Sequence, residues 1–183
     1  MQSRNNQLIK RIKKIFKPVM KIQTQNTPQQ VHLGKLIEDM SVAMLTTSND
    51  AGLLDSRPMS PLEMDSEGAI WFFTELNTSK TANLSTANLA FSDTSNGTYV
   101  SLSGRGEIHK NSEDIHRLWT VFAKPWFPDG PDSPNLALLK FIPNAAEYWD
   151  APHSKTIRLF SIAASIVTGK PVNMGDHDII KNI

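Results

Sequence analysis

Short apolar segments separated by turn residues dominate the middle of the chain. Residues 41–48, 53–60 and 69–74 are bounded by Gly, Asn, Asp or Ser, and the turns NDAG and DSEG lie between them. Short segments with such turns are typical of antiparallel strands. Further segments of the same kind are residues 88–93, 98–110, 135–143 and 145–150. We therefore predict a mainly β fold, a meander of six or seven strands that forms a closed or partly closed barrel.

Helical periodicity marks fewer segments. Residues 31–40 place four apolar side chains on one face, and Ser112 is a predicted N-cap that opens a second helix, which ends before Pro125. Weaker helical patterns cover residues 79–86 and 156–167. The helices are expected to flank the barrel.

The first residues of the chain differ from the remainder in charge and pattern. Residues 1–22 carry seven basic residues and no acidic one, with apolar residues between them at helical spacing. The other 161 residues hold 12 basic and 18 acidic groups, a formal net charge of −6. We predict that residues 1–30 form a basic amphipathic helix and a polar linker, and that residues 31–183 form the folded domain.

Composition excludes several classes of function. The chain has no cysteine, which rules out disulfides, thiolate metal sites and a cysteine nucleophile and suits a reducing cytoplasm. No segment reaches the roughly 20 apolar residues that span a bilayer, and no secretory signal is recognised. The acidic and histidine side chains of GDHD, residues 175–178, are adjacent in the sequence, and we predict no metal site there.

A cation beside consecutive aromatic residues is the main candidate for chemistry. Arg57 lies at the end of one predicted strand. The next predicted strand follows after one turn and contains the consecutive aromatic residues Trp71, Phe72 and Phe73. Taken singly, these are ordinary core and surface residues. Together with the Ser/Lys segment at residues 77–80, they suit a phosphorylated aromatic ligand, whose phosphate favours an arginine fork, a lysine charge and hydroxyl donors.

Several longer motifs give a more specific indication. The chain resembles the general stress protein 26 family, within the pyridoxamine 5′-phosphate oxidase-like group of FMN-binding split barrels. The resemblance spans about residues 31–178 and is carried by MLTTSNDAGLLDSRPM, WFFT, YVSLSGRGEI, KPWFPDGPDSPNLALLKF, AEYWDAP and TGKPVNMGDHD. It implies a six-stranded antiparallel split β-barrel with flanking helices, which works as a homodimer with FMN, or alternatively FAD, where the subunits meet.

The resemblance also implies which residues contact the flavin. Arg57, Pro58 and Met59 match the strand beside the flavin, where Arg57 faces the phosphate and the backbone near Met59 meets the ring edge. No side chain is expected to act as a catalytic acid or base. The second flavin-lining strand, the phosphate loop and a capping loop are matched by Phe72, Phe73 and Thr74, by Ser79 and Lys80, and by Trp126.

The expected function is FMN binding, with flavin-dependent oxidoreductase activity through hydride or electron transfer. One alternative is a non-catalytic flavin-binding or redox-sensing stress module, and another is a pyridoxamine 5′-phosphate oxidase. A further alternative is a structural dimer without flavin, because the segment after Lys80 is shorter than in relatives.

Two partners are expected. A homodimer is predicted from the surplus of large aromatic residues in the second half of the chain, which are Trp119, Phe122, Trp126, Phe127, Tyr148 and Trp149. The basic tail predicts weak, salt-sensitive contact with a membrane surface, and the alternative is a solvated or partner-docked helix. Nucleic acid is disfavoured because the rest of the chain is acidic.

Overall fold

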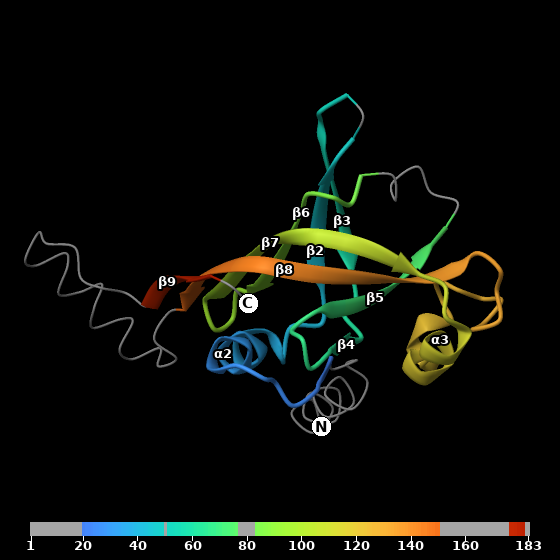
Figure 1. Ribbon diagram of the computed structural model, residues 1–183, viewed down its shortest axis with the longest axis horizontal. Coiled ribbons are helices and arrows are strands. Elements are labelled where there is room, and N and C mark those ends of the chain that lie inside the picture. The colour runs from blue at the N-terminus through green and yellow to red at the C-terminus, as the bar shows by residue number, and fades with distance from the viewer. Residues whose placement is uncertain (1–19, 50, 77–82, 151–175, 182–183) are drawn as a thin grey trace, which may run out of the picture.

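Six antiparallel strands form the main sheet of the computed structural model, in the order β3–β2–β6–β7–β8–β5. The residues that the structure describes are 20–49, 51–76, 83–150 and 176–181. The sheet is strongly curved, and its two outermost strands do not pair with each other, so the barrel is split (Figure 1). The six strands are β2 (Ala43–Ser48), β3 (Leu54–Met59), β5 (Ile70–Glu75), β6 (Ala87–Asp93), β7 (Thr98–His109) and β8 (Leu136–Asp150). The predicted fold class is confirmed.

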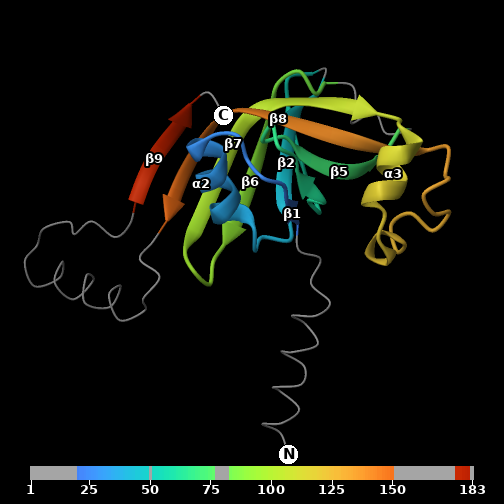
Figure 2. The same cartoon turned by 60° about the horizontal axis from the view of Figure 1, so that its bottom comes forward.

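Shorter elements extend this sheet and cover it. Beyond β5 lie β4 (Glu63–Met64) and then β1 (Lys21–Ile22), which pairs with β4 in parallel. At its other end β8 pairs with β9 (Asp176–Lys181). Two α-helices and one 3₁₀-helix are described: α2 (Pro28–Ile37), α3 (Ser112–Leu118) and η2 (Val121–Ala123). Figure 2 shows α2 and α3 at opposite ends of the sheet.

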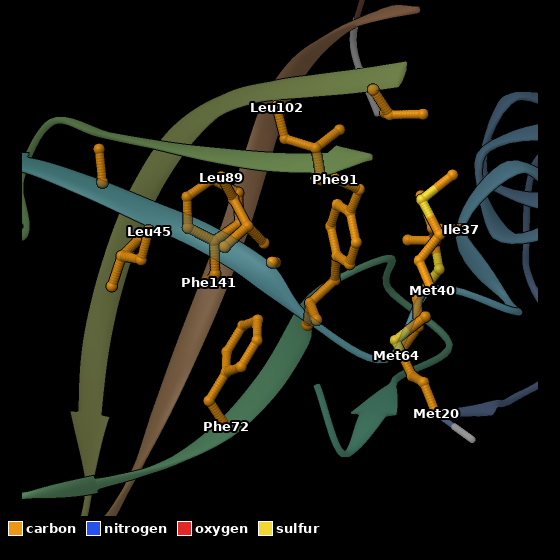
Figure 3. Close-up of a cluster of buried hydrophobic side chains, with 14 of the residues drawn as sticks. Met20, Ile37, Met40, Leu45, Met64, Phe72, Leu89, Phe91, Leu102 and Phe141 are labelled. Atoms are coloured by element: carbon orange, nitrogen blue, oxygen red, sulfur yellow. The ribbon is translucent and has the colours of Figure 1, made fainter. Parts of the chain in front are cut away.

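The main core lies inside the curved sheet and is closed by α2. Phe72, Phe91 and Phe141 are fully buried there, together with Ile37 of the helix (Figure 3). Leu33 of the same helix is also buried in this core. Because side chains alternate along a strand, β2 and β6 place every second residue in this core. No described helix is long and apolar enough to cross a membrane.

A second, smaller core forms on the other face of β5. It joins Trp71 and Phe73 to Ile115 and Leu118 of α3 and to Leu138 of β8. The α3 helix is shorter than predicted and is capped by Asn111, not by Ser112, because the Asn111 side chain accepts hydrogen bonds from the first-turn amides. The helix ends at Leu118, so residues 119–125 are not its continuation.

A register shift bends the longest hairpin. β8 is one continuous strand through residues 136–150, where the sequence predicts two. The shift occurs between Ser103 and Gly104 of β7, and a Cβ on Gly104 would overlap the carbonyl oxygen of Ile142. The glycine is required because the two backbones approach closely.

The segment predicted as a polar linker packs against the folded domain. The side chains of Gln25 and Asn26 donate hydrogen bonds of 2.8 Å to the carbonyls of Asp65 and Ser66. Thr27 then caps α2 through a capping box, which starts the helix at Pro28. The predicted helix over residues 156–167 lies outside the described residues, as does the basic tail up to residue 19. Lys21 and Ile22 form β1, so the predicted helix does not extend to them.

Candidate functional site

Arg57 lies on the core-facing side of the edge strand β3. It is directly opposite Leu45 of β2, a buried core residue, and opposite residues on paired strands share a face. The Arg57 side chain is half-buried, and this burial lowers the pKa of its guanidinium below the ordinary value. The ordinary pKa of an arginine lies far above neutrality, so Arg57 keeps its positive charge at neutral pH.

The two residues after Arg57 point to opposite faces of β3. Pro58 is exposed on the outer face, and its lack of an N–H is tolerated because β3 is the last strand of the sheet. Met59 is half-buried and packs against the main core, on the same face as Arg57. The structure therefore brings the cation and the methionine side chain to one face, and Pro58 lies on the other face.

The aromatic pair of β5 does not form a single wall. Phe72 is fully buried in the main core, whereas Phe73 faces the second core, where its ring centroid lies 5.5 Å from that of Trp119. Consecutive residues of a strand point to opposite faces, so both rings cannot line one ligand. Thr74 is buried on the same side as Phe72 and brings a polar hydroxyl to the end of this strand.

Ser79 and Lys80, the predicted phosphate loop, lie outside the described residues. The segments that flank this loop are held by backbone hydrogen bonds. The Leu76 amide donates to the Asn135 carbonyl at 2.9 Å, and the Gly106 amide donates to the Leu84 carbonyl at 2.7 Å. The start and the end of the loop are therefore tied to the strand-connecting segment before β8 and to β7.

Trp126 lies in the proline-rich loop between η2 and β8 and is 68% exposed. This loop lines a pocket of about 110 Å³ at the end of β5. Arg57 is not among the lining residues, so the structure does not bring Trp126 and Arg57 together within one chain. The residues that line the pocket are Glu75, Trp126, Phe127, Pro128, Asp129, Ser133, Asn135 and Leu136.

The outer face of the sheet carries exposed apolar residues that the sequence reasoning did not identify. They lie on five strands and share one face by register: Met44, Leu54, Tyr99, Trp149 and Ile179. Small residues such as Ala90 and Ser101 separate them. The sequence signal for this face is the set of alternate positions along the predicted strands that point away from the core.

The histidine of the GDHD motif, His177, contacts neighbouring side chains on the outer sheet face. His177 stacks on the ring of Trp149 at 5.0 Å between centroids, and its Nε2 lies 3.0 Å from Oε1 of Glu147. Within the described part of the chain, no group of three or more metal-binding side chains gathers.

Several known proteins are similar to this chain in fold and in sequence. Residues 28–173 match the pyridoxamine 5′-phosphate oxidase-like family. The crystal structure of a general stress protein 26 from Jannaschia sp. CCS1 is similar, with a TM-score of 0.68 and 28% identity over 85% of this chain and 99% of that chain. A general stress FMN/FAD binding protein of Xanthomonas citri is also similar, with a TM-score of 0.59 and 30% identity over 69% of this chain and 91% of that chain.

A curated relative covers the same region. Protein bli-3 of Neurospora crassa is 25% identical over 178 residues, which span 86% of this chain and 85% of the relative. The matched residues 28–173 extend from the first turn of α2 beyond β8 and include the strands that carry Arg57, Met59 and Thr74. The chain therefore belongs to the pyridoxamine 5′-phosphate oxidase-like family.

Proposed function

We propose that this protein binds FMN between two copies of the chain and works as a flavin-dependent oxidoreductase. The observation that carries the proposal is the position of Arg57, a permanently charged and half-buried side chain that faces the core from the last strand of the sheet. A planar guanidinium matches a phosphate by paired hydrogen bonds. The Xanthomonas citri relative is described as binding FMN or FAD.

The side chains on this face fit a phosphorylated flavin. Arg57 supplies charge for the phosphate, Met59 contributes an apolar contact from the same strand, and Thr74 supplies a hydroxyl from β5. Because the Phe72 ring is packed in the core, its contribution to a ligand would come from its backbone. When bound, the flavin supplies hydride or single-electron transfer, and the protein supplies orientation and charge.

The experiment for cofactor binding is the absorbance spectrum of the protein after gel filtration, with and without added FMN or FAD. The proposal predicts a flavin spectrum that travels with the protein. A colourless protein that also takes up no added flavin would reject it. For the variant Arg57→Ala, the control for loss of a positive charge is Arg105→Ala, because Arg105 is exposed on β7 and pairs with Glu107 at 3.4 Å.

Catalysis needs a second measurement, because a non-catalytic flavin-binding module requires the same pocket. Anaerobic stopped-flow mixing of the flavin-loaded protein with NADH, NADPH or pyridoxamine 5′-phosphate measures bleaching of the flavin band. Reduction by one of them supports an oxidoreductase. Stable flavin with no reduction would support the binding module. The absence of cysteine suits the cytoplasmic location that we also propose.

Support for a dimer comes from the outer sheet face. The exposed side chains of Met44, Tyr99 and Trp149 lie there among small residues, and exposed apolar surfaces of this kind are usual at subunit interfaces. The aromatic surplus expected from the sequence is partly used within one chain, since Trp119 and Phe127 pack on Phe73. The proposed interface is therefore the outer sheet face, and we place the flavin at the border of this interface, where Arg57 and Met59 lie on the core-facing side of the edge strand β3.

A charge at the centre of this face tests the dimer. Ala90 lies between Met44 and Ser101 by register, so Ala90→Arg places a cation in the proposed interface without entering the core. Sedimentation equilibrium should show a dimer for the wild type and a monomer for Ala90→Arg. The control is Thr94→Arg, in the exposed β6–β7 turn. A dimer that survives Ala90→Arg would reject this interface.

A further inference from the structure

The pocket below Trp126 has features that the proposed flavin site does not use. It lies where β5 ends and β8 begins, and its volume is about 110 Å³. Drug-sized ligands occupy pockets of roughly 300–1,000 Å³, whereas an engineered apolar cavity of about 150 Å³ holds benzene. The pocket is therefore of a size for one small head group.

The loop that forms the pocket is shaped by its own backbone. The amide of Trp126 donates to the Ala123 carbonyl at 3.0 Å, and the Gly130 amide donates to the Phe127 carbonyl at 3.1 Å. Gly130 has a φ of +81°, a conformation that favours glycine. Four prolines between residues 124 and 134 restrict the backbone further. The loop would therefore lose little conformational entropy when a ligand binds.

An exposed aromatic ring forms one side of this pocket. Trp126 is 68% exposed, whereas Trp71 is 7% exposed in the second core. Phe127 also lines the pocket, and its ring packs against that of Phe73, with 5.8 Å between the ring centroids. The faces of aromatic rings carry negative potential and attract cations.

Carboxylates give the pocket a negative charge. Asp129 of the loop and Glu75 at the end of β5 both line it, and the described lining residues include no lysine, arginine or histidine. The remaining polar groups, Ser133 and Asn135, are uncharged. Among the described residues, the carboxylate of Asp129 therefore favours a positive charge in the pocket over a phosphate or carboxylate.

We propose that this pocket binds the ammonium head group of a small cationic ligand, with the cation against the Trp126 ring and beside the carboxylate of Asp129. Indole rings are the strongest aromatic partners of quaternary ammonium groups, and a nearby carboxylate adds charge attraction. The site goes beyond the proposed flavin function, because it needs neither the flavin nor Arg57.

Three probes of nearly equal shape test the charge requirement. They are choline, the uncharged 3,3-dimethylbutan-1-ol and the anionic 3,3-dimethylbutyrate. The readout is the NMR signal of the Trp126 indole N–H in the full chain, assigned as the one of four tryptophan signals that is missing in Trp126→Phe. Choline should shift this signal at concentrations about tenfold lower than the alcohol, and the anion should not shift it. Equal effects of all three probes, or no effect of choline, would overturn the proposal.

Variants locate the binding groups. Asp129→Asn should weaken choline binding about three- to fivefold. Trp126→Ala should weaken it about tenfold, as measured by calorimetry because this variant lacks the indole signal. The matched controls are Asp132→Asn, a carboxylate of the same loop outside the pocket lining, and Trp149→Phe on the sheet face, and both should bind choline normally. Thermal melting confirms that each variant is folded. Loss of choline binding in the controls would contradict the assignment.

Flavin competition separates this site from the flavin site. Choline binding should be unchanged when the protein is saturated with FMN, because the carboxylate of Asp129 disfavours a phosphate in the pocket. Displacement of choline by FMN would place the pocket in the flavin site and overturn the proposal. If the protein binds no FMN at all, the choline titration still stands on its own and the flavin proposal alone fails.

Discussion

Replacing Arg117 with methionine should destabilise the whole fold, because it leaves a buried carboxylate without its cation. Glu63 on β4 is 4% exposed, and its Oε1 accepts hydrogen bonds from Nη1 of Arg117 at 2.7 Å and from Nε2 of Gln23 at 2.9 Å. The Glu63 hydrogen bond raises the pKa of Arg117 above its ordinary value. The pair joins the N-terminal segment, β4 and α3.

The magnitude follows from the unequal burial of the two groups. Breaking a fully buried ion pair costs about 3–5 kcal/mol, but Arg117 is 43% exposed, so water replaces part of the interaction. We expect a loss of about 2 kcal/mol in the free energy of unfolding, equivalent to roughly 4–8 °C in Tm for a domain of this size. Thermal and urea unfolding of Arg117→Met give this quantity.

A double-mutant cycle isolates the pair. Glu63→Gln removes the charge and keeps an acceptor for Gln23, so Arg117→Met should cost less in the Glu63→Gln background than in the wild type. Arg105→Met serves as the control, because Arg105 has an exposed partner in Glu107. A loss below about 0.5 kcal/mol for Arg117→Met, or full additivity in the cycle, would refute this reasoning.

Two further predictions concern acid stability and the basic tail. The pKa of Asp93 is lowered, first by the hydrogen bond from Ser95, so its stabilising effect is present above about pH 4 and is lost as the pH falls through its folded-state pKa. Tm should therefore decrease less in Asp93→Asn than in the wild type as the pH is lowered. An unchanged dependence of Tm on pH would contradict this role. Changing Lys10, Lys13 and Lys14 together to Gln in the full chain should abolish sedimentation with anionic vesicles at low salt, and equal sedimentation of variant and wild type would argue against membrane contact.

The strands were predictable because their signals are local. Gly52 and Gly68 have φ values of +76° and +84°, and they mark the two turns that the sequence identified. The capping box of Thr27 and Gln30 was also readable, but the surrounding polar residues suggested a linker. The side chains of these polar residues donate hydrogen bonds to carbonyls about forty positions away, such as that of Asp65, and no local pattern predicts these partners.

Other features depend on tertiary packing. The sequence predicts that one strand ends at Pro143, but Pro143 lies opposite Gly104 at the register shift, where β8 continues through it. The opposite orientation of Phe72 and Phe73 follows from strand alternation and was predictable. That Trp119 would pack on Phe73 was not, because it depends on where α3 docks.

The role of Arg57 as the phosphate anchor is the central claim, and paired titrations with FMN and riboflavin test it most directly. A charge-assisted hydrogen bond contributes about 1.5–3 kcal/mol, so Arg57→Ala should weaken FMN by roughly one to two powers of ten. Riboflavin lacks the phosphate, and its affinity should change little between the wild type and Arg57→Ala. Equal weakening of both ligands, or unchanged FMN affinity in Arg57→Ala, would contradict the account.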